Sequence, residues 1–255
     1  MVAQSDIGIV LVLPEILGTY GDAGNGEVLL RRALWRGHRA RLLRPTHPAD
    51  IPENGDIYVI GGGEDAPQAL AARELAQCPA FLHGLDNGAV LLAVCAGFQI
   101  LGRRFPGSDG TAVDGLGLFA CETTPGTTRC IGEVVAEVGP PLSLPPLTGY
   151  ENHAGVTVLD AGARPLARVV SGGGNDGRGG EGILDGHRVG TYLHGPVLAR
   201  NPALADRLLE WVAGPLDAID DHLVDDLRRR RLAAVPVPRR PSWARNVRGR
   251  RRTYS

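Results

Sequence analysis

One cysteine of this chain stands where an expected strand meets an expected helix. Cys95 follows the apolar run Ala89–Val94 without a gap, and a helical pattern continues from there to Leu101. Ligands of parallel α/β sheets gather at the carboxyl ends of strands, and the positive end of a helix dipole favours a thiolate. A thiol with the ordinary pKa near 8.5 is only about 3% ionised at pH 7. The stabilisation of the thiolate by the helix dipole therefore decides whether Cys95 is a nucleophile. This segment alone leaves open a buried structural cysteine.

A second candidate group ends a later strand-like run. His194 follows the run Arg188–Leu193 and precedes Gly195-Pro196, which forces a turn. A histidine at a strand end can reach over the end of a neighbouring strand and act as a general base. A lone histidine is more often a satisfied polar residue. A cysteine and a histidine that both stand at strand ends, however, together indicate nucleophilic catalysis.

Two glycine-rich runs have different interpretations. Gly61–Gly63 follow an expected strand, so their N–H groups and that of Ala96 could bind the oxyanion of an acyl-transfer intermediate. A tight turn explains this triplet equally well. The run 172–177 matches the GxGxxG pattern, but more glycine follows it instead of a helix. The dinucleotide interpretation therefore fails, and we expect a mobile hairpin loop there.

The elements that must position these groups alternate between strands and helices in the first hundred residues. This alternation predicts an α/β, doubly wound, mostly parallel sheet flanked by helices in a single domain. The expected strands are Ile7–Leu13, Ala40–Leu43, Ile57–Ile60 and Ala89–Val94, and the expected helices are Glu27–Arg36, 67–85 and the one that reaches Leu101.

The chain after Gly102 consists of short β-like pieces, followed by two helices. The pieces either extend the parallel sheet or form an antiparallel layer beside it. For the first of the two helices we expect Asn201 as the cap and Pro202 in the first turn. The pieces are Gly117–Cys121, Cys130–Val138, Thr157–Leu159, Ala167–Val170 and Arg188–Leu193, and the helices are Asn201–Ala213 and Asp217–Leu227.

Charge divides the chain into two parts. Residues 1–227 hold 16 arginines and all 28 acidic residues, a balance of −12, whereas residues 228–255 hold 11 arginines and no acid. We therefore expect a folded domain over 1–227 and a weakly ordered basic tail over 228–255, with docking of the tail to an acidic partner or a membrane surface as the alternative. The negative charge of the body argues against nucleic-acid binding.

All 27 positively charged residues are arginine, which excludes lysine-dependent sites. A P-loop, a kinase-type ATP site and a lysine Schiff base each require a lysine. The N-terminus has no basic signal-peptide region, and no apolar stretch reaches the roughly 18 residues needed to cross a membrane. We expect a cytoplasmic protein with reduced cysteines. The four cysteines form no CxxC pair, so no zinc or other metal site is expected.

Six separated segments resemble class I glutamine amidotransferase domains of the cobyric acid synthase type. Within that group, the chain most resembles the glutaminase subunits of lipid II isoglutaminyl synthases, over about residues 8–213. The segments are VCAGFQILG, GYENHAGVT, GTYLHGPVLARNPALAD, LPEILGTYGDAGNGEVL, GGGED and TTRCIGEVV.

The resemblance implies a doubly wound fold in which Cys95 is the nucleophile and His194 is its base. It further implies that Arg129 helps to hold the substrate L-glutamine, a role that suits bidentate pairing of a guanidinium with a carboxylate.

The oxyanion region implied by the resemblance contains Gly62, Gly63 and Ala96. Relatives commonly have glycine at the position of Ala96. A glutamate commonly stands two residues after the histidine, where this chain has Pro196. A Cys–His dyad is therefore implied, with Glu151 as a speculative orienting group.

The resemblance also implies a partner. This is a Mur-ligase-like synthetase subunit of the MurT type, which activates a carboxylate with ATP and forms a heterodimer with this chain. Ammonia would then amidate D-glutamate of lipid II to D-isoglutamine, which brings the complex to the inner face of the membrane. The missing lysines agree with ATP being handled by the partner, and no cofactor is implied here. We expect slow glutamine hydrolysis without the partner.

Three other functions remain open from the sequence. The first is an autonomous cysteine hydrolase similar to γ-glutamyl peptidases. The second is a glutaminase for a cobalamin-pathway synthetase, which usually carries its synthetase domain on the same chain. The third is a non-catalytic module that keeps the fold.

Overall fold

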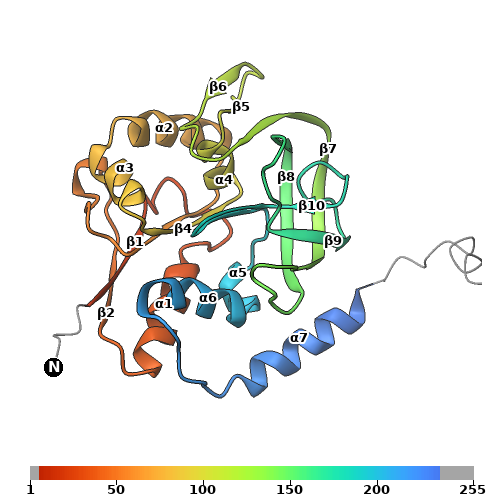
Figure 1. Ribbon diagram of the computed structural model, residues 1–255. Coiled ribbons are helices and arrows are strands. Elements are labelled where there is room, and N and C mark those ends of the chain that lie inside the picture. The colour runs from red at the N-terminus through yellow and green to blue at the C-terminus, as the bar shows by residue number, and fades with distance from the viewer. Residues whose placement is uncertain (1–5, 236–255) are drawn as a thin grey trace, which may run out of the picture.

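The first strand of the chain lies buried inside a six-stranded sheet (Figure 1). The structure is a computed structural model that describes residues 6–235. The strand order is β11-β12-β4-β3-β1-β2, and every neighbouring pair is parallel except β11 and β12. The strands are β1 (Ile7–Leu11), β2 (Ala40–Leu43), β3 (Ile57–Ile60), β4 (Val90–Val94), β11 (Ile183–Asp185) and β12 (Arg188–Thr191).

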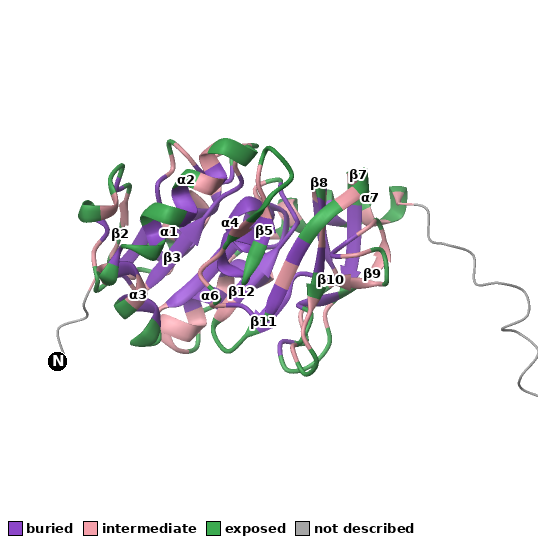
Figure 2. Cartoon of the chain, turned by 90° about the horizontal axis from the view of Figure 1, so that it is seen from above, coloured by how far each residue is buried: buried purple, intermediate pink, exposed green. Residues whose placement is uncertain are grey.

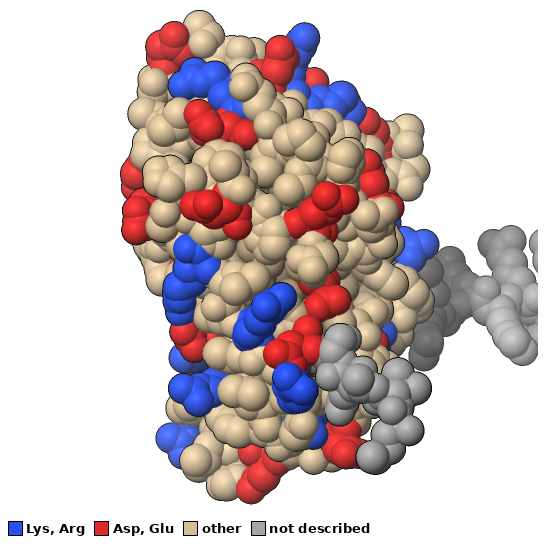
Figure 3. Space-filling model, turned by 90° about the vertical axis from the view of Figure 1, so that its left-hand side faces the viewer, with Lys and Arg blue, Asp and Glu red and all other residues tan. Residues whose placement is uncertain are grey.

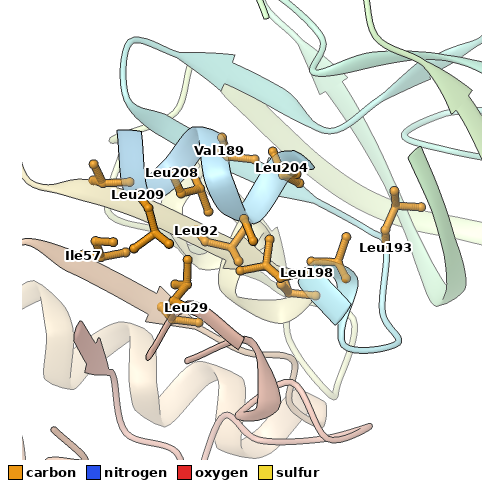
Figure 4. Packing of buried hydrophobic residues seen from close by; sticks show 14 of the residues in the cluster. Leu29, Ile57, Leu92, Val189, Leu193, Leu198, Leu204, Leu208 and Leu209 are labelled. Atoms are coloured by element: carbon orange, nitrogen blue, oxygen red, sulfur yellow. The ribbon is translucent and has the colours of Figure 1, made fainter. Parts of the chain in front are cut away.

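Helices cover both faces of this sheet. Because successive strand residues point to opposite faces, Leu92 of β4 packs in a cluster with α1, α5 and α6 (Figure 4), whereas Leu91 packs in a second cluster with α2, α3 and α4. The central strands are buried as a result (Figure 2), and the predicted doubly wound α/β fold is confirmed. The helices are α1 (Gly24–Trp35), α2 (Asp65–Ala76), α3 (Pro79–Asp86), α4 (Ala96–Leu101), α5 (Val197–Arg200) and α6 (Pro202–Ala213), with a 3-10 turn η1 (Pro48–Asp50).

Two expected elements between residues 67 and 121 differ in the structure. The helix expected over 67–85 is the pair α2 and α3, because Pro79 has no N–H group and instead begins a new helix. The strand expected over Gly117–Cys121 does not form. Backbone N–H groups of this segment donate to the end of α4 instead, as Gly117 does to Gly102 O and Phe119 does to Leu101 O.

Some of the later β-like pieces extend the parallel sheet and others form an antiparallel layer beside it, which are the two arrangements that the sequence allowed. β12 extends the parallel sheet, while four other strands form an antiparallel sheet of order β10-β9-β7-β8. A two-residue bridge joins the sheets, because the backbones of Tyr150 and His194 exchange hydrogen bonds of 3.1 and 2.9 Å. The strands of the second sheet are β7 (Cys121–Glu137), β8 (Leu147–Leu159), β9 (Ala167–Ser171) and β10 (Gly180–Glu181), and a separate hairpin contains β5 (Arg104–Pro106) and β6 (Ala112–Asp114).

The last helix continues into the predicted tail. The helix expected over Asp217–Leu227 begins at His222 and ends at Ala234 as α7. Its buried residue Arg228 donates to Arg200 O, Asn201 Oδ1 and Pro146 O. The division of the chain at residue 227 stays a prediction, and residues 236–255 of the predicted tail lie outside the described residues.

The expected cap of α6 is confirmed in position, with Asn201 as the capping residue and Pro202 in the first turn. The side chain of Asn201 makes no capping hydrogen bond to the helix. Its amide instead accepts from Thr148 N–H and donates to Thr148 O, so it ties α6 to β8.

Charged side chains of both signs are interspersed on the face shown in Figure 3. Over residues 6–235, no helix combines the length and the apolar character needed to span a bilayer.

Candidate active site

The backbone bends sharply at Cys95, between β4 and α4. This residue has φ 51° and ψ −105°, in the left-handed region that residues other than glycine rarely adopt. Its backbone is held on both sides, because Cys95 N–H donates to Thr191 O and Cys95 O accepts from Gln99 N–H. The half-buried side chain lines a cavity of about 280 Å³. Strain of this kind accumulates at functional sites, where the surrounding structure enforces it.

His194 follows β12, the strand that pairs directly with β4. Its Nδ1 atom lies 2.9 Å from Asp22 Oδ2, and both side chains are buried. Because a carboxylate only accepts, the proton of this hydrogen bond belongs to Nδ1. His194 Nε2 is buried and has no hydrogen-bond partner within residues 6–235. The imidazole is therefore fixed by Asp22 with its second nitrogen available.

Gly62 shows how closely the cysteine and the histidine approach each other. A Cβ atom built on Gly62 would lie 3.0 Å from His194 Cε1 and 3.6 Å from Cys95 Cβ. The same atom would lie 3.2 Å from Asp22 Oδ2. The structure thus brings together the two groups expected from the sequence, around a glycine that leaves no room for a side chain.

The environment of His194 favours its protonated form. Burial disfavours the imidazolium, but the hydrogen bond that His194 donates to Asp22 and the neighbouring Cys95 outweigh this effect and raise the pKa of His194 to about 10. A positive imidazole beside a sulfur atom is the arrangement that stabilises a thiolate.

The expected substrate-binding arginine lies on the wall of the same cavity. Arg129 Nε donates to Asn152 Oδ1 at 2.5 Å, and Asn152 Nδ2 donates to Tyr20 OH at 2.5 Å. The ring of Tyr20 stands edge-on to His194, with 4.9 Å between the ring centroids. The two terminal nitrogens of Arg129 have no protein partner in the described part of the chain, so they can pair with a carboxylate.

Two N–H groups remain available for an oxyanion. Gly62 N–H donates to Asp22 Oδ2 at 2.9 Å and is therefore engaged. Gly63 N–H donates to no acceptor within residues 6–235. Ala96 is the first residue of α4, so its N–H has no partner inside the helix. Both residues line the cavity beside Cys95.

Sequence reasoning missed Asp22. The structure places Asp22 against His194, at the position where Glu151 was considered as the orienting group. Glu151 instead accepts the N–H groups of Gly173 and Gly174. The only sequence signal for Asp22 was an acidic residue among glycines just before an expected helix, inside the segment GTYGDAGNG.

The glycine-rich loop after β9 is anchored, although a mobile loop was expected. Asn175 is buried, donates to Gly182 O and accepts from Gly182 N–H.

Comparisons with known proteins agree on one family. The model of the CobB/CobQ-like glutamine amidotransferase domain matches residues 8–202. The lipid II isoglutaminyl synthase (glutamine-hydrolyzing) subunit GatD of Staphylococcus aureus is 36% identical over 208 residues, which cover 80% of this chain and 84% of that protein. The corresponding subunit of Streptococcus pneumoniae is 35% identical and covers 80% and 79%.

More distant similarities extend the comparison. Cobyric acid synthase of Sphingopyxis alaskensis is 36% identical, but the match covers 66% of this chain and only 33% of that protein. A solved glutamine amidotransferase has the same fold, with a TM-score of 0.55 and 19% identity over 80% of this chain and 97% of its own.

Proposed function

Because this chain belongs to the CobB/CobQ-like glutamine amidotransferase domain family, we propose that Cys95 is the nucleophile with which it hydrolyses glutamine. His194 is the base and proton donor, and Asp22 orients it. The observation that carries this proposal is the convergence of a strained cysteine and a buried Asp–His pair on one cavity.

The first half of the reaction forms a thioester. The Cys95 thiolate attacks the side-chain carbonyl carbon of glutamine, and the N–H groups of Gly63 and Ala96 bind the oxyanion that forms. The C–N bond then breaks, and the His194 imidazolium gives its Nε2 proton to the departing nitrogen, which leaves as ammonia. A γ-glutamyl thioester and a neutral imidazole remain.

The second half restores the enzyme. His194 Nε2 takes a proton from water as the oxygen attacks the thioester carbonyl. The C–S bond breaks, the thiolate leaves, and glutamate departs after releasing one proton to solvent. The thiolate and the imidazolium are then ready for the next substrate. Asp22 accepts from Nδ1 throughout, so the ring keeps the orientation needed for both proton transfers.

Arg129 recognises the substrate in this proposal. The terminal nitrogens of its guanidinium have no protein partner in residues 6–235, and Arg129 lines the same cavity as Cys95. Paired with the α-carboxylate of glutamine, they fix the distance from that carboxylate to the scissile amide.

We further propose that the ammonia serves a synthetase subunit that amidates lipid II. The similarity to two GatD subunits over about four-fifths of both chains supports this assignment. Each of those relatives is named as a subunit, which implies a partner. The partner proposed here is a Mur-ligase-like ATP-dependent subunit of the MurT type. The absence of lysine from this chain agrees with ATP being bound by that partner.

Reconstitution tests the proposed function. The synthetase subunit alone should amidate a lipid II acceptor with ammonium salts but not with glutamine. Addition of this chain should make glutamine a nitrogen donor. If the synthetase uses glutamine equally well without this chain, the chain does not supply its ammonia. If this chain hydrolyses γ-glutamyl peptides rapidly and never binds the synthetase, an autonomous hydrolase is the better description.

A further inference from the structure

Three potential metal ligands meet on the paired strands β7 and β8. Cys130 and His153 are directly opposite each other in the antiparallel register, and Glu151 lies two residues before His153 on the same face of β8. One ligand atom from each of the three side chains lies within 4.8 Å of the other two. His153 and Glu151 are buried, and Cys130 is half-buried. We call these three residues the Cys130 cluster.

The orientation of His153 leaves one nitrogen without a partner. Its Nδ1 lies 2.8 Å from Gly155 O, and since a carbonyl only accepts, Nδ1 carries the proton. Nε2 is buried, makes no hydrogen bond in the described residues, and lies 3.6 Å from Glu151 Oε2. The ring stacks on Tyr192 with 3.7 Å between centroids, which prevents it from turning away. A lone pair and a carboxylate oxygen thus face each other across a gap that a cation would fill.

The carboxylate is held as firmly as the imidazole. Gly173 N–H donates to Glu151 Oε1 at 2.7 Å, and Gly174 N–H donates to Oε2 at 2.9 Å. Metal sites in proteins have such an outer layer, in which a carbonyl fixes the histidine tautomer and hydrogen bonds orient the carboxylate. A Cβ atom on Gly173 would come within 2.8 Å of Cys130 Sγ, so this loop closes directly over the cluster.

We propose that Cys130, Glu151 and His153 form a binding site for one divalent ion of the zinc class. Thiolate, imidazole and carboxylate are the ligands that Zn²⁺ prefers, whereas Mg²⁺ and Ca²⁺ prefer oxygen. Two anionic ligands balance the charge of the ion, and a water molecule would complete its tetrahedral coordination. On binding, the Cys130 thiol loses its proton to solvent and the S–Zn bond forms.

The geometry requires only a small adjustment. Tetrahedral ligands at 2.0–2.3 Å from Zn²⁺ stand about 3.3–3.8 Å from one another. The His153–Glu151 distance of 3.6 Å is already in that range. All three separations are within 4.8 Å, so the widest must shrink by at most about 1 Å to reach it. Rotation of the half-buried Cys130 side chain can supply this movement. The site was not predictable from the sequence, because its ligands come from two strands and include a single cysteine.

The cluster is separate from the proposed catalytic residues but borders them. His153 lines the same cavity as Cys95, and Arg129 immediately precedes Cys130 in β7. A metal ion could also bind Cys95 and His194, so the test must remove that site first. The inference itself does not depend on the proposed reaction.

Titration of the full-length Cys95→Ser variant with Zn²⁺ alone, and then with Co²⁺ as a spectroscopic probe, tests the site. One ion should bind per chain, and Co²⁺ should show a thiolate charge-transfer band. A further Cys130→Ser change should remove the band and weaken Zn²⁺ binding at least about 100-fold, since loss of an outer-layer contact alone typically costs about 10- to 100-fold. Glu151→Gln should also weaken binding.

Cys78→Ser in the same background is the matched control, because Cys78 is a thiol outside the cluster that donates to Pro48 O. It should bind Zn²⁺ like its parent, and circular dichroism should report a folded chain for every variant. Failure of the folded parent to bind Zn²⁺, or equal binding after Cys130→Ser, would overturn the proposal.

Discussion

Asp22 Oδ2 lies 2.9 Å from His194 Nδ1, although the two residues are 172 positions apart in the chain. The same carboxylate oxygen accepts Gly62 N–H from the end of β3. A single buried carboxylate therefore ties the loop before α1 to the ends of β3 and β12. The Asp22 carboxylate also fixes the orientation of the imidazole, so that Nε2 is the nitrogen that points away from Asp22.

Replacement of Asp22 by asparagine should lower kcat for glutamine at least about 100-fold. The neutral amide of asparagine no longer stabilises the His194 imidazolium and no longer holds its proton on Nδ1. The same change costs about 10⁴-fold in a serine triad, and a thiol that is easily ionised needs less help. Steady-state kinetics in the presence of the synthetase subunit measure the effect. Asp50→Asn, on an exposed turn, is the control. Unchanged kcat in Asp22→Asn would remove Asp22 from the mechanism.

The pKa of His194 predicts how its contribution to stability depends on pH. The folded pKa of about 10 lies above the ordinary value of 6.5, so folding favours the protonated form. This stabilisation is complete below about pH 6.5 and is lost as the pH rises toward 10. The free energy of unfolding of the unchanged chain should therefore exceed that of the His194→Gln variant, and the difference should shrink between about pH 6.5 and about pH 10. Denaturant unfolding of both proteins at several pH values checks this prediction. A difference in the free energy of unfolding that stays constant with pH would contradict it.

The elements around the site were largely predictable, because local patterns specify them. Apolar runs bounded by turn residues indicated the strands that precede Cys95 and His194. Asp22 was not predictable in this way, because its role depends on a contact between segments far apart in sequence, and its own neighbourhood is a glycine-rich loop. The contacts of Glu151 were not predictable for the same reason, since its partners Gly173 and Gly174 belong to a distant loop.

A methyl group at Gly62 should disturb the site without unfolding the chain. The Cβ atom of Gly62→Ala would press on His194 Cε1 at 3.0 Å and on Asp22 Oδ2 at 3.2 Å. We expect kcat to fall at least about tenfold, since displacements near 1 Å can cost about 100-fold. Gly139→Ala is the control, because a Cβ atom there meets nothing within 4 Å. Equal glutaminase rates for the two variants would show that the close packing at Gly62 has no catalytic consequence.

Replacement of Arg129 by lysine should raise KM for glutamine more than it lowers kcat. Lysine keeps the positive charge but cannot pair with a carboxylate through two parallel hydrogen bonds. Loss of one charge-assisted hydrogen bond costs about 1.5–3 kcal/mol, or about 10- to 150-fold in KM. Arg178→Lys, an exposed arginine outside the cavity, should leave KM unchanged. A fall in kcat at constant KM would instead place Arg129 in the chemical step.

Detection of the covalent intermediate tests the central claim most directly. The chain is mixed with glutamine and its synthetase subunit, and the reaction is quenched in acid. After digestion, the mass of the Cys95 peptide is measured by mass spectrometry. We predict one glutamyl group on Cys95, its absence in Cys95→Ala, and loss of glutamine hydrolysis in that variant. Glutamine hydrolysis that continues in Cys95→Ala, or a glutamyl group on another residue, would contradict the account.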